Sequence, residues 1–496
     1  MDAYIVPKND EFFSEYAFPN RLKTISNFSG SAGFSIITNK ANYLFVDGRY
    51  LIQSKIECGK KFNIIEIPYT YPKDILYHNK LKKIGYDPKL FTSSTLERYF
   101  GNKYQLIPIK KNLVDLIFLE KQKKEAPFFK IDDKIAGETV ASKIDRLSKI
   151  VKKNKSDNIF VSAPENVAWL LNIRGKDNPN SPIPNARLIM DKRKNIFFFS
   201  NLNKIKNIKN KINYKKIKFY SFYEFYSILL KLNSLYFTID KLTCSLFYQS
   251  LIHSKYKINN FEDPIYHLKS IKNNTEIENM RTAHIKDGVA LTKFLYWIKQ
   301  NKNFGFDELS LEKKLEFFRK KNKDYIYPSF NTIAGSGPNS AIIHYRSSKK
   351  TNRKIKKNDI FLCDSGGQYK YGTTDVTRTV CFKKPSEKIK NIFTRVLKGH
   401  IAVATHNLNN IRKGYLIDKK ARAALNKINL DYGHGTGHGV GFFSNVHEGP
   451  QAISKFNSVE LKEGMIVSNE PGYYAEGKFG IRIENLIYVA KVKNKL

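Results

Sequence analysis

Short apolar runs open the chain and alternate with stretches of helical periodicity. FSIIT at 34–38 and NYLFVDGRY at 42–50 have strand composition and are joined by the turn-like NKA, and NIIEI follows at 63–67. A helix is expected around 74–83. Because strands and helices alternate, residues 1–125 are predicted to form an α/β layer.

A second α/β unit is predicted over residues 126–265, after the charged, proline-containing segment KQKKEAPFFK. Apolar residues recur at helical spacing between 135 and 153, and the strand-like NIFVSA follows. The first two units are therefore alike in outline, although the sequence contains no clean internal repeat.

The third unit, residues 266–496, begins with a different pattern. Thr275 and Glu278 form a capping-box pattern ahead of a long helix that ends near Gln300. From Asp359 onward, glycines separate short strand-like runs: DIFLCDSGG, TTDVTRTV, MIVSNEPG and GIRIENLIYVA. At 496 residues the chain is too long for one ordinary core, so three units agree with its length.

The composition indicates a soluble globular protein with no membrane partner. Hydrophobic residues make up 41% of the chain, and no apolar run approaches the roughly 18 residues needed to span a bilayer. The N-terminal MDAYIVPKNDEFF carries a charge at its second residue and a proline inside its short apolar stretch, unlike a secretory signal. We therefore expect a cytoplasmic location.

Four cysteines are scattered along the chain without CxxC spacing, in or beside strand-like apolar stretches. We expect reduced, buried thiols, which agrees with a cytoplasmic compartment. A thiolate-rich zinc site is excluded because the cysteines do not occur in pairs. The four are Cys58, Cys244, Cys363 and Cys381.

The formal net charge of +41 would normally indicate a nucleic-acid partner. Of the 86 basic residues, however, only 16 are Arg, and the chain is also rich in Asn and Ile, as an AT-rich genome encodes by default. Nucleic-acid-binding proteins favour Arg and interleave exposed aromatic residues with it. The densest basic stretch, at 204–218, is therefore interpreted as a solvated surface, and no specific nucleic-acid partner is expected.

Candidate chemistry is concentrated in the third unit. Asp364 ends the run DIFLCD just before a Ser-Gly-Gly turn, and Asp375 follows in TTDVTRTV. If these two runs pair as a hairpin, the carboxylates can face one another. Taken alone, either residue would more often be a turn or cap residue.

The segment YGHGTGHGVGFFSNVHEGP is more specific. It holds His434, His438 and His447 among closely spaced glycines, which let backbone pass near a buried site. Three of the chain's ten histidines fall in this one segment, which is unusual for core filler. The alternative is a flexible surface loop that binds metal adventitiously.

Two further carboxylates complete the set. In GIRIENLIYVA the two-residue period of a strand places Arg482 and Glu484 on one face, where they must be paired or bind a metal. Glu470 is held extended before Pro471 in SNEPGYY. Four carboxylates and one imidazole can hold two divalent ions about 3.5–4 Å apart, so metal-assisted hydrolysis is the leading hypothesis. Oxygen-rich ligation favours Mn²⁺, with Co²⁺, Fe²⁺ or Zn²⁺ as substitutes.

The stretches DSGGQYKYGTTDVTRTV, GTGHGVG, VHEGPQ, NEPGYY and GIRIEN resemble motifs of the pita-bread metallopeptidases, which include methionine aminopeptidase, prolidase and aminopeptidase P. AYIVP, SEY, SGSAGFSIIT, VDGRY, ENVAWLLNIRG and IAGSGPNSAIIHY are similar to the three-domain cytosolic aminopeptidase P. The resemblance covers nearly the whole chain. It implies two creatinase-like α/β domains followed by a catalytic pita-bread domain.

The resemblance also implies a set of ligands for two divalent metal ions. Asp375 and Glu484 are expected to bridge or chelate both ions, and Glu470 to shuttle the proton of the bridging water. The five implied ligands are Asp364, Asp375, His438, Glu470 and Glu484.

Four more residues match active-site positions of the family. His344 and His447 match histidines that contact the substrate and stabilise the tetrahedral intermediate. His434 matches a further active-site histidine, and Arg482 matches an arginine near the bridging glutamate. Tyr371 departs from the family, in which an acidic residue is usual at this turn.

The implied activity is removal of the first residue from peptides with proline second, by an enzyme that forms a homodimer. A prolidase, which cleaves only Xaa-Pro dipeptides, stays open because the sequence does not locate a block against longer peptides. Methionine aminopeptidase needs no pair of N-terminal α/β units, and a creatinase-like amidinohydrolase would not require the five ligands. A non-enzymatic pita-bread protein that binds RNA or acidic partners through its basic surface is the alternative from another class.

Overall fold

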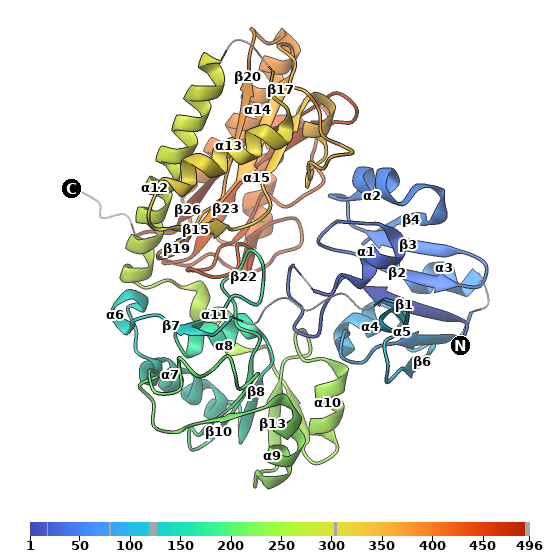
Figure 1. The fold of residues 1–496 in the computed structure, drawn as a ribbon, viewed down its shortest axis with the longest axis vertical. Coiled ribbons are helices and arrows are strands. Elements are labelled where there is room, and N and C mark those ends of the chain that lie inside the picture. Colours follow the sequence, from blue (N-terminus) through green and yellow to red (C-terminus); the bar gives the residue numbers. More distant parts are fainter. Residues whose placement is uncertain (17, 79–80, 119–125, 302–304, 492–496) are drawn as a thin grey trace. The chain divides into compact units, whose positions relative to one another are not determined.

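The structure is a computed structural model with a mixed α/β fold (Figure 1). Among the residues it describes, no helix is both long enough and apolar enough to cross a membrane. The described residues are 1–16, 18–78, 81–118, 126–301 and 305–491.

Internal contacts divide the chain into two compact units. The first comprises Met1–Pro179 and Ile183–Ile265, and the second comprises Asn180–Pro182 and Tyr266–Leu496. The predicted boundary between a first and a second domain follows residue 125 and falls at the end of 119–125, which lie outside the described residues. That division of the first unit stays a prediction.

The N-terminal part of the first unit is built on a six-stranded mixed sheet. Its strand order is β4 (Asn63–Glu66), β3 (Asn42–Val46), β2 (Phe34–Thr38), β1 (Ala3–Pro7), β5 (Lys83–Tyr86) and β6 (Gln105–Pro108). β1, β2 and β3 pair antiparallel, whereas β4, β5 and β6 are joined in parallel. The strands predicted from FSIIT, NYLFVDGRY and NIIEI are confirmed as β2, β3 and β4.

The helix expected around 74–83 is shorter, and the chain then enters the sheet. α3 spans Pro72–His78, whereas Lys83 begins β5, which pairs in parallel with β1. Ile84 is fully buried in this sheet, so tertiary burial outweighs the helical pattern. The other helices of this part are α1 (Arg21–Ser26), α2 (Leu51–Cys58), η1 (Gly59–Lys61), α4 (Ser93–Phe100) and α5 (Leu113–Ile117).

The rest of the first unit contains a second six-stranded sheet, in agreement with the predicted likeness in outline. β10 pairs antiparallel with both of its neighbours, and the remaining neighbours are parallel. The strand order is β12 (Ile217–Tyr220), β11 (Ile196–Phe199), β10 (Arg187–Asp191), β8 (Asn158–Val161), β13 (Tyr236–Ile239) and β14 (Lys257–Asn260).

The helix predicted between 135 and 153 is divided in two. α6 (Asp133–Ala136) ends at Gly137, whose left-handed backbone (φ 69°) stops the helix. α7 (Val140–Lys153) then begins anew, because the Thr139 side chain accepts a hydrogen bond from the Ser142 N–H. The remaining elements are β7 (Phe129–Lys130), α8 (Pro164–Leu170), β9 (Ile173–Arg174), η2 (Phe222–Glu224), α9 (Phe225–Lys231) and α10 (Leu246–His253).

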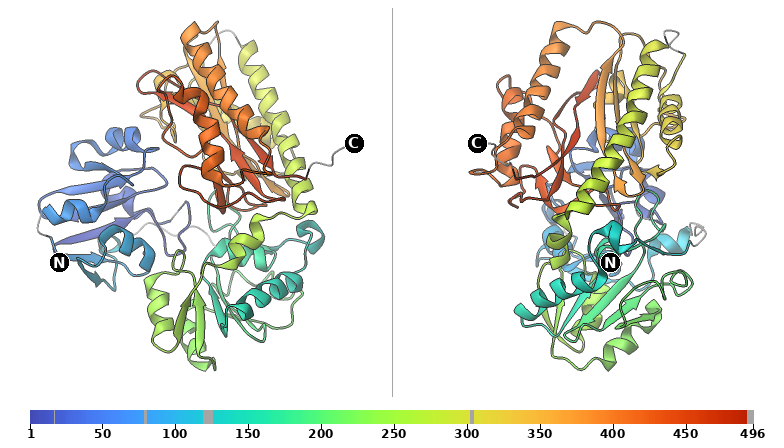
Figure 2. Two further views of the ribbon diagram at one scale, coloured as in Figure 1. Left: turned by 180° about the vertical axis from the view of Figure 1, so that it is seen from behind. Right: turned by 90° about the vertical axis from the view of Figure 1, so that its left-hand side faces the viewer.

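The second unit places short strands between two pairs of helices, α12 with α13 on one side and α14 with α15 on the other (Figure 2). The helices are α12 (Asn274–Gln300), α13 (Glu308–Lys320), η3 (Gly337–Ala341), α14 (Glu387–Ala404) and α15 (Gly414–Asn426), preceded by α11 (Pro264–Ser270), which begins in the first unit and ends in the second. Two three-stranded sheets are formed by β15 (Tyr325–Pro328), β18 (Gly367–Tyr369) and β19 (Gly372–Thr373), and by β16 (Ile333–Ser336), β17 (Ile360–Ser365) and β20 (Val376–Cys381). The others contain β22 (Glu448–Ile453), β21 (Gly437–Gly439), β23 (Ile466–Asn469) and β26 (Asn485–Tyr488), and the pair β24 (Gly472–Ala475) and β25 (Phe479–Arg482).

The long helix of the third predicted unit is α12, but its cap is not the one predicted. The capping box is made by Asn273 and Glu276, each accepting from the other's backbone N–H. Thr275 lies inside the first turn, so the pattern it forms with Glu278 is not used. Asn273 provides the cap because its extended backbone precedes the helix.

The cysteines are free thiols, as predicted, and Cys58, Cys244 and Cys363 are buried while Cys381 is half-buried. Burial raises the pKa of the Cys58 thiol to about 11 and that of Cys363 to about 12. These thiols are therefore protonated at neutral pH and are poor nucleophiles.

Candidate metal centre

Asp364 and Asp375 approach each other through strand pairing. β17 and β20 pair antiparallel with Asp364 opposite Thr377, and Asp375 immediately precedes β20. Both side chains belong to buried residues, 8% and 4% exposed. The pairing predicted from the two sequence runs is confirmed, with β18 and β19 inserted between the paired strands.

His438, at the middle of β21, faces two carboxylates. Its Nε2 lies 3.5 Å from an oxygen of Asp375 and 3.4 Å from Oε1 of Glu470. Its Nδ1 donates a hydrogen bond to the Gly439 carbonyl at 3.0 Å, so in the neutral ring Nε2 carries a lone pair. This orientation, with one ring nitrogen bonded to a carbonyl and the other directed at two carboxylates, is typical of a metal-binding histidine.

Ser468 fixes the relative positions of His438 and Glu470. Its hydroxyl accepts from the His438 N–H at 2.9 Å and donates to Glu470 Oε1 at 3.0 Å. The Glu470 N–H in turn donates to the Thr436 carbonyl at 2.8 Å. The two candidate ligands are therefore held by the same short network.

Glu484 lies in a break between two strands and not within one continuous strand as predicted. The run GIRIENLIYVA forms β25, which ends at Arg482, and β26, which begins at Asn485. The break arises because the two strands pair with different partners, and the Glu484 N–H donates to the Thr377 carbonyl at 3.3 Å. Arg482 and Glu484 are nevertheless both buried.

Three of the predicted ligands converge on one point. Ligand atoms of Asp375, His438 and Glu484 all lie within 4.8 Å of one another. The Thr377 hydroxyl donates to Glu484 at 2.6 Å and orients that carboxylate. Glu470 joins the group through its contact with His438.

The negative charges of the carboxylates repel one another. Burial, followed by the charges of the neighbouring carboxylates, raises the pKa of Glu484 well above its usual range, and burial raises the pKa of Asp375 to about 6. Burial lowers the pKa of His438, but its contact with Asp375 and the charge of Glu470 outweigh burial and raise the pKa to about 9. A cation at this point would relieve these charges.

Arg482 offers the cluster one positive charge and links it to His434. Its Nη2 donates to Asp364 at 2.6 Å, and its Nη1 donates to the Tyr474 hydroxyl at 2.6 Å. Tyr474 then donates to His434 Nε2 at 2.8 Å, since His434 Nδ1 carries the proton given to the Gly435 carbonyl. A continuous chain of hydrogen bonds therefore links Asp364 to His434 through Arg482 and Tyr474.

Tyr474 was not singled out in the sequence, although it lies in NEPGYY beside Glu470. We expect Tyr474→Phe to lower the free energy of unfolding by about 1.5–3 kcal/mol, because it leaves Nη1 of the buried Arg482 without its hydroxyl acceptor. Denaturant titration measures this loss. The matched control is Tyr473→Phe in the same strand, expected to change stability by less than about 0.5 kcal/mol. Equal effects of the two variants would contradict the assigned role of Tyr474.

The remaining predicted residues lie around this cluster. The rings of His447 and His438 are 4.2 Å apart between centroids. His344 is half-buried just after η3, and the carbonyl of its neighbour Ile343 accepts from Arg482 Nη2 at 3.4 Å. Both histidines are thus connected to residues of the cluster, His447 directly and His344 through the adjacent backbone.

A buried ion pair on α15 supports the histidine loop and was also missed. Arg422 contacts Asp418 at 2.7 Å and donates to the His434 carbonyl at 2.6 Å, while Thr436 donates to Asp418 at 2.6 Å. In the sequence these two residues have the spacing of an ordinary surface pair, so no local signal distinguishes them.

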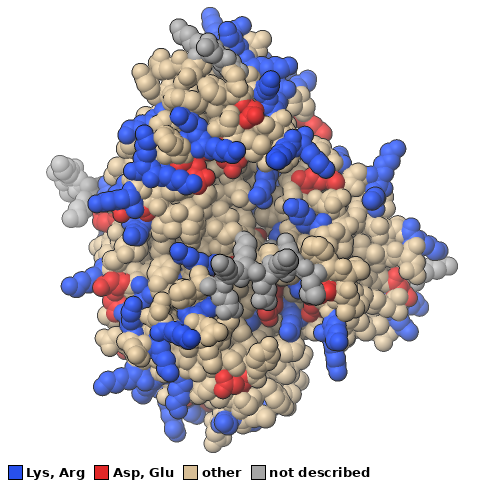
Figure 3. Space-filling view, in the orientation of Figure 1, with Lys and Arg blue, Asp and Glu red and all other residues tan. Residues whose placement is uncertain are grey.

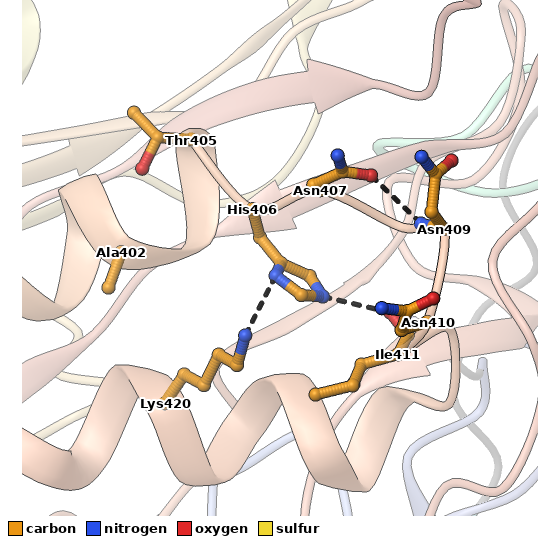
Figure 4. A pocket seen from close by; sticks show the side chains of 8 residues that line it. All are labelled: Ala402, Thr405, His406, Asn407, Asn409, Asn410, Ile411 and Lys420. Atoms are coloured by element: carbon orange, nitrogen blue, oxygen red, sulfur yellow. Dashed lines mark hydrogen bonds between the residues drawn. The ribbon is translucent and has the colours of Figure 1, made fainter.

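A surface pocket of about 600 Å³ lies elsewhere, between α14 and α15 (Figure 4). Nζ of Lys420 lies 3.0 Å from Nδ1 of His406, and Nε2 of His406 lies 2.8 Å from the Ile411 carbonyl oxygen. The residues that line this pocket include no carboxylate and none of the predicted site residues. It is therefore not the predicted metal centre.

Comparison with known proteins identifies the family. The model of metallopeptidase family M24 matches residues 278–491, and the model of the creatinase/prolidase N-terminal domain matches residues 120–276. A probable Xaa-Pro aminopeptidase P of Laccaria bicolor is 39% identical, over 99% of this chain and 80% of the relative. The chain belongs to metallopeptidase family M24. The chain is also 36% identical to the Xaa-Pro aminopeptidase ApepP of Drosophila melanogaster, over 99% of this chain and 83% of that protein.

Solved structures of an aminopeptidase and a prolidase are similar to this chain. The X-prolyl aminopeptidase of Caenorhabditis elegans, described as a cytosolic enzyme with a di-nuclear active site, is 32% identical. It superposes with a TM-score of 0.91 over 98% of this chain and 83% of its own. The prolidase of Pyrococcus furiosus, 26% identical, has a TM-score of 0.59 and covers 70% of this chain and 97% of its own. The similarity to the aminopeptidase thus extends over more of the chain.

Proposed function

We propose that this protein is a metal-dependent Xaa-Pro aminopeptidase, which releases the first residue from peptides with proline second. The observation that carries the proposal is a buried carboxylate and histidine cluster in a chain that aligns over nearly its whole length with X-Pro aminopeptidases. The X-Pro bond is a tertiary amide whose ring restricts the neighbouring backbone, so it calls for a dedicated enzyme.

The cluster fits two divalent cations. Asp364 Oδ1 is buried and has no hydrogen-bond partner among the described residues, whereas its other oxygen accepts from Arg482. Such an orphaned anionic oxygen, together with the converging ligand atoms of Asp375, His438 and Glu484, is a donor set that a cation would satisfy. Oxygen-rich ligation favours Mn²⁺, with Co²⁺, Fe²⁺ or Zn²⁺ as substitutes. The proposed ligands are Asp364, Asp375, His438, Glu470 and Glu484.

Bound ions would polarise the scissile carbonyl and lower the pKa of a water molecule. The chain's own residues supply the remaining steps. Glu470, whose side chain is 17% exposed, would take the proton of the attacking water and deliver it to the proline nitrogen. His447 and His344 would donate hydrogen bonds to the carbonyl oxygen as its negative charge develops. Arg482 and His434 would hold Asp364 and the rim of the site in place.

A strict prolidase is the nearest alternative, and peptide length separates the two. We expect the Mn²⁺-loaded protein to cleave both an Xaa-Pro dipeptide and a longer peptide with proline second, releasing only the first residue. Product identification by mass spectrometry provides the measurement. Cleavage of the dipeptide alone would instead assign a prolidase.

A non-enzymatic protein with a basic binding surface is less well supported. On the face seen in Figure 3, lysine and arginine side chains are scattered and do not line one groove. Salt-dependent retention of RNA without metal-dependent peptidase activity would favour this alternative. The description of the C. elegans relative as cytosolic supports a cytoplasmic location, and the homodimer stays a prediction from the family resemblance.

A further inference from the structure

A further buried ion pair of the second unit joins α12 to α13. Arg319 Nε donates to Asp287 Oδ1 at 2.6 Å, and Arg319 Nη2 donates to Oδ2 at 3.1 Å. Both residues are almost fully buried, with exposures of 1% and 2%. Burial disfavours ionisation of Asp287, but Arg319 outweighs burial and lowers the pKa of Asp287, so the pair is charged. Desolvating two charges is costly and is repaid only by good geometry.

The same pair contacts both segments that carry the aspartate ligands proposed above, β17 and the residues just before β20. The Thr374 hydroxyl donates to Asp287 Oδ2 at 2.9 Å, and Arg319 Nη2 donates to the Ser365 hydroxyl at 3.0 Å. Thr374 immediately precedes Asp375, and Ser365 immediately follows Asp364. One ion pair therefore contacts the neighbour of each aspartate.

Thr374 is held from several sides, so a change in its position is passed to Asp375. Its hydroxyl accepts from the Gly367 N–H at 2.8 Å, and its own N–H donates to the Gly367 carbonyl at 2.9 Å. Its carbonyl accepts from the Ser329 hydroxyl at 2.8 Å. A Cβ on Gly366 would lie only 1.9 Å from that carbonyl, so the two segments are in close contact.

Side-chain direction places the ion pair behind the metal centre. Successive side chains of a strand point to opposite faces, so Ser365 points away from the face to which Asp364 points. The ion pair thus touches the back of β17 while the carboxylate of Asp364 projects from its front.

We propose that Asp287 and Arg319 are positioning residues, which set the separation of Asp364 and Asp375 through Ser365 and Thr374 and so tune metal affinity. The inference rests on the proposed two-metal function. It requires that weakening the link to Thr374 loosens metal binding even when the ion pair itself remains.

The test compares Thr374→Val with Thr374→Ser in metal-free protein titrated with Mn²⁺ in a calorimeter. Valine has the shape of threonine but cannot donate to Asp287, whereas serine retains the hydroxyl. We expect Thr374→Val to weaken Mn²⁺ binding by about 10–100-fold, as is usual for residues that orient metal ligands, and Thr374→Ser to bind like the wild type.

Tyr369→Phe is the matched control. Its hydroxyl donates to the same Asp287 carboxylate at 2.8 Å, but β18 carries no proposed ligand. We expect this variant to lose thermal stability about as much as Thr374→Val while binding Mn²⁺ with unchanged affinity. Equal weakening by both variants would show that the ion pair acts only through general stability, and would overturn the proposal.

The remaining outcomes distinguish failure of the positioning role from failure of the proposed two-metal function. Tight Mn²⁺ binding by folded Thr374→Val would overturn the positioning role and leave the two-metal function intact. If the wild-type protein binds neither Mn²⁺ nor another divalent ion, the proposed metal-dependent function itself is contradicted. If Thr374→Val does not fold, Ser365→Ala takes its place, because it removes the hydrogen bond from Arg319 and retains both aspartates. Weaker Mn²⁺ binding by Ser365→Ala would support the positioning role, and wild-type affinity would overturn it.

Discussion

Replacing Glu470 with glutamine is expected to lower kcat on an Xaa-Pro peptide by about 10²–10⁴-fold. Glutamine retains the size of glutamate and can still accept from Ser468, but it cannot take and return a proton. Because the carboxamide can also receive the Ser468 hydrogen bond, we expect the fold to be kept. Steady-state kinetics on the metal-loaded variant, with circular dichroism of the same sample, provides the measurement.

Loss of a ligand and loss of proton transfer must be separated, because Glu470 is proposed for both roles. Metal content of the purified variant is therefore determined by elemental analysis before assay. The matched control is Glu476→Gln, a nearby exposed glutamate in a turn, expected to leave kcat unchanged. Near-normal turnover by fully metal-loaded Glu470→Gln would contradict the assignment of Glu470 as proton carrier.

Local patterns in the sequence predicted the most regular part of this site. Asp364 stands where an apolar run meets a Ser-Gly-Gly turn, and the run around Asp375 has strand composition. The two runs do pair, as β17 and β20, and the residues between them form a small hairpin of their own. The glycine spacing around His438 likewise indicated close backbone packing, and β21 is flanked by two strands.

Glu484 shows where strand periodicity fails. The two-residue period placed Glu484 and Arg482 on one face of a single strand, but β25 ends at Arg482 and pairs with β24, while β26 pairs with β23. Glu484 is directed into the cluster by Thr377, a residue more than a hundred positions earlier. A change of partner strands depends on tertiary contacts, so the local alternation of polar and apolar residues does not indicate it.

The supporting residues could not be predicted for a related reason. Asp287, Arg319 and Arg422 are charged residues within helices, and a charged residue in an amphipathic helix normally faces solvent. Only the packed fold shows that these three are buried. Asp287 and Arg319 contact residues next to a proposed ligand, and Arg422 contacts the carbonyl of His434. Conversely, the pair Thr275 and Glu278 had the correct spacing for a cap but lay inside the helix.

Removing divalent ions with a chelator is expected to abolish hydrolysis and to lower the thermal midpoint. Without cations, burial and the mutual repulsion of the carboxylates raise the pKa values of Asp375 and Glu484. Mn²⁺ added back at about 100 times its Kd should stabilise the fold by about 2.7 kcal/mol for each site it occupies. Thermal melts and peptide assays on the same samples measure both effects.

Asp375→Asn is the control variant for the chelator experiment, because it separates charge repulsion from metal binding. In chelator the variant should melt at or above the wild-type temperature, since it removes one of the repelling carboxylates. Added Mn²⁺ should then restore no activity and give a smaller stabilisation than in the wild type, since a proposed bridging ligand is lost. A metal-free wild type that keeps its activity, or a variant that gains as much stability from Mn²⁺ as the wild type, would contradict the two-metal centre. General misfolding of the variant would instead lower its melting temperature below that of the wild type in chelator as well as in Mn²⁺.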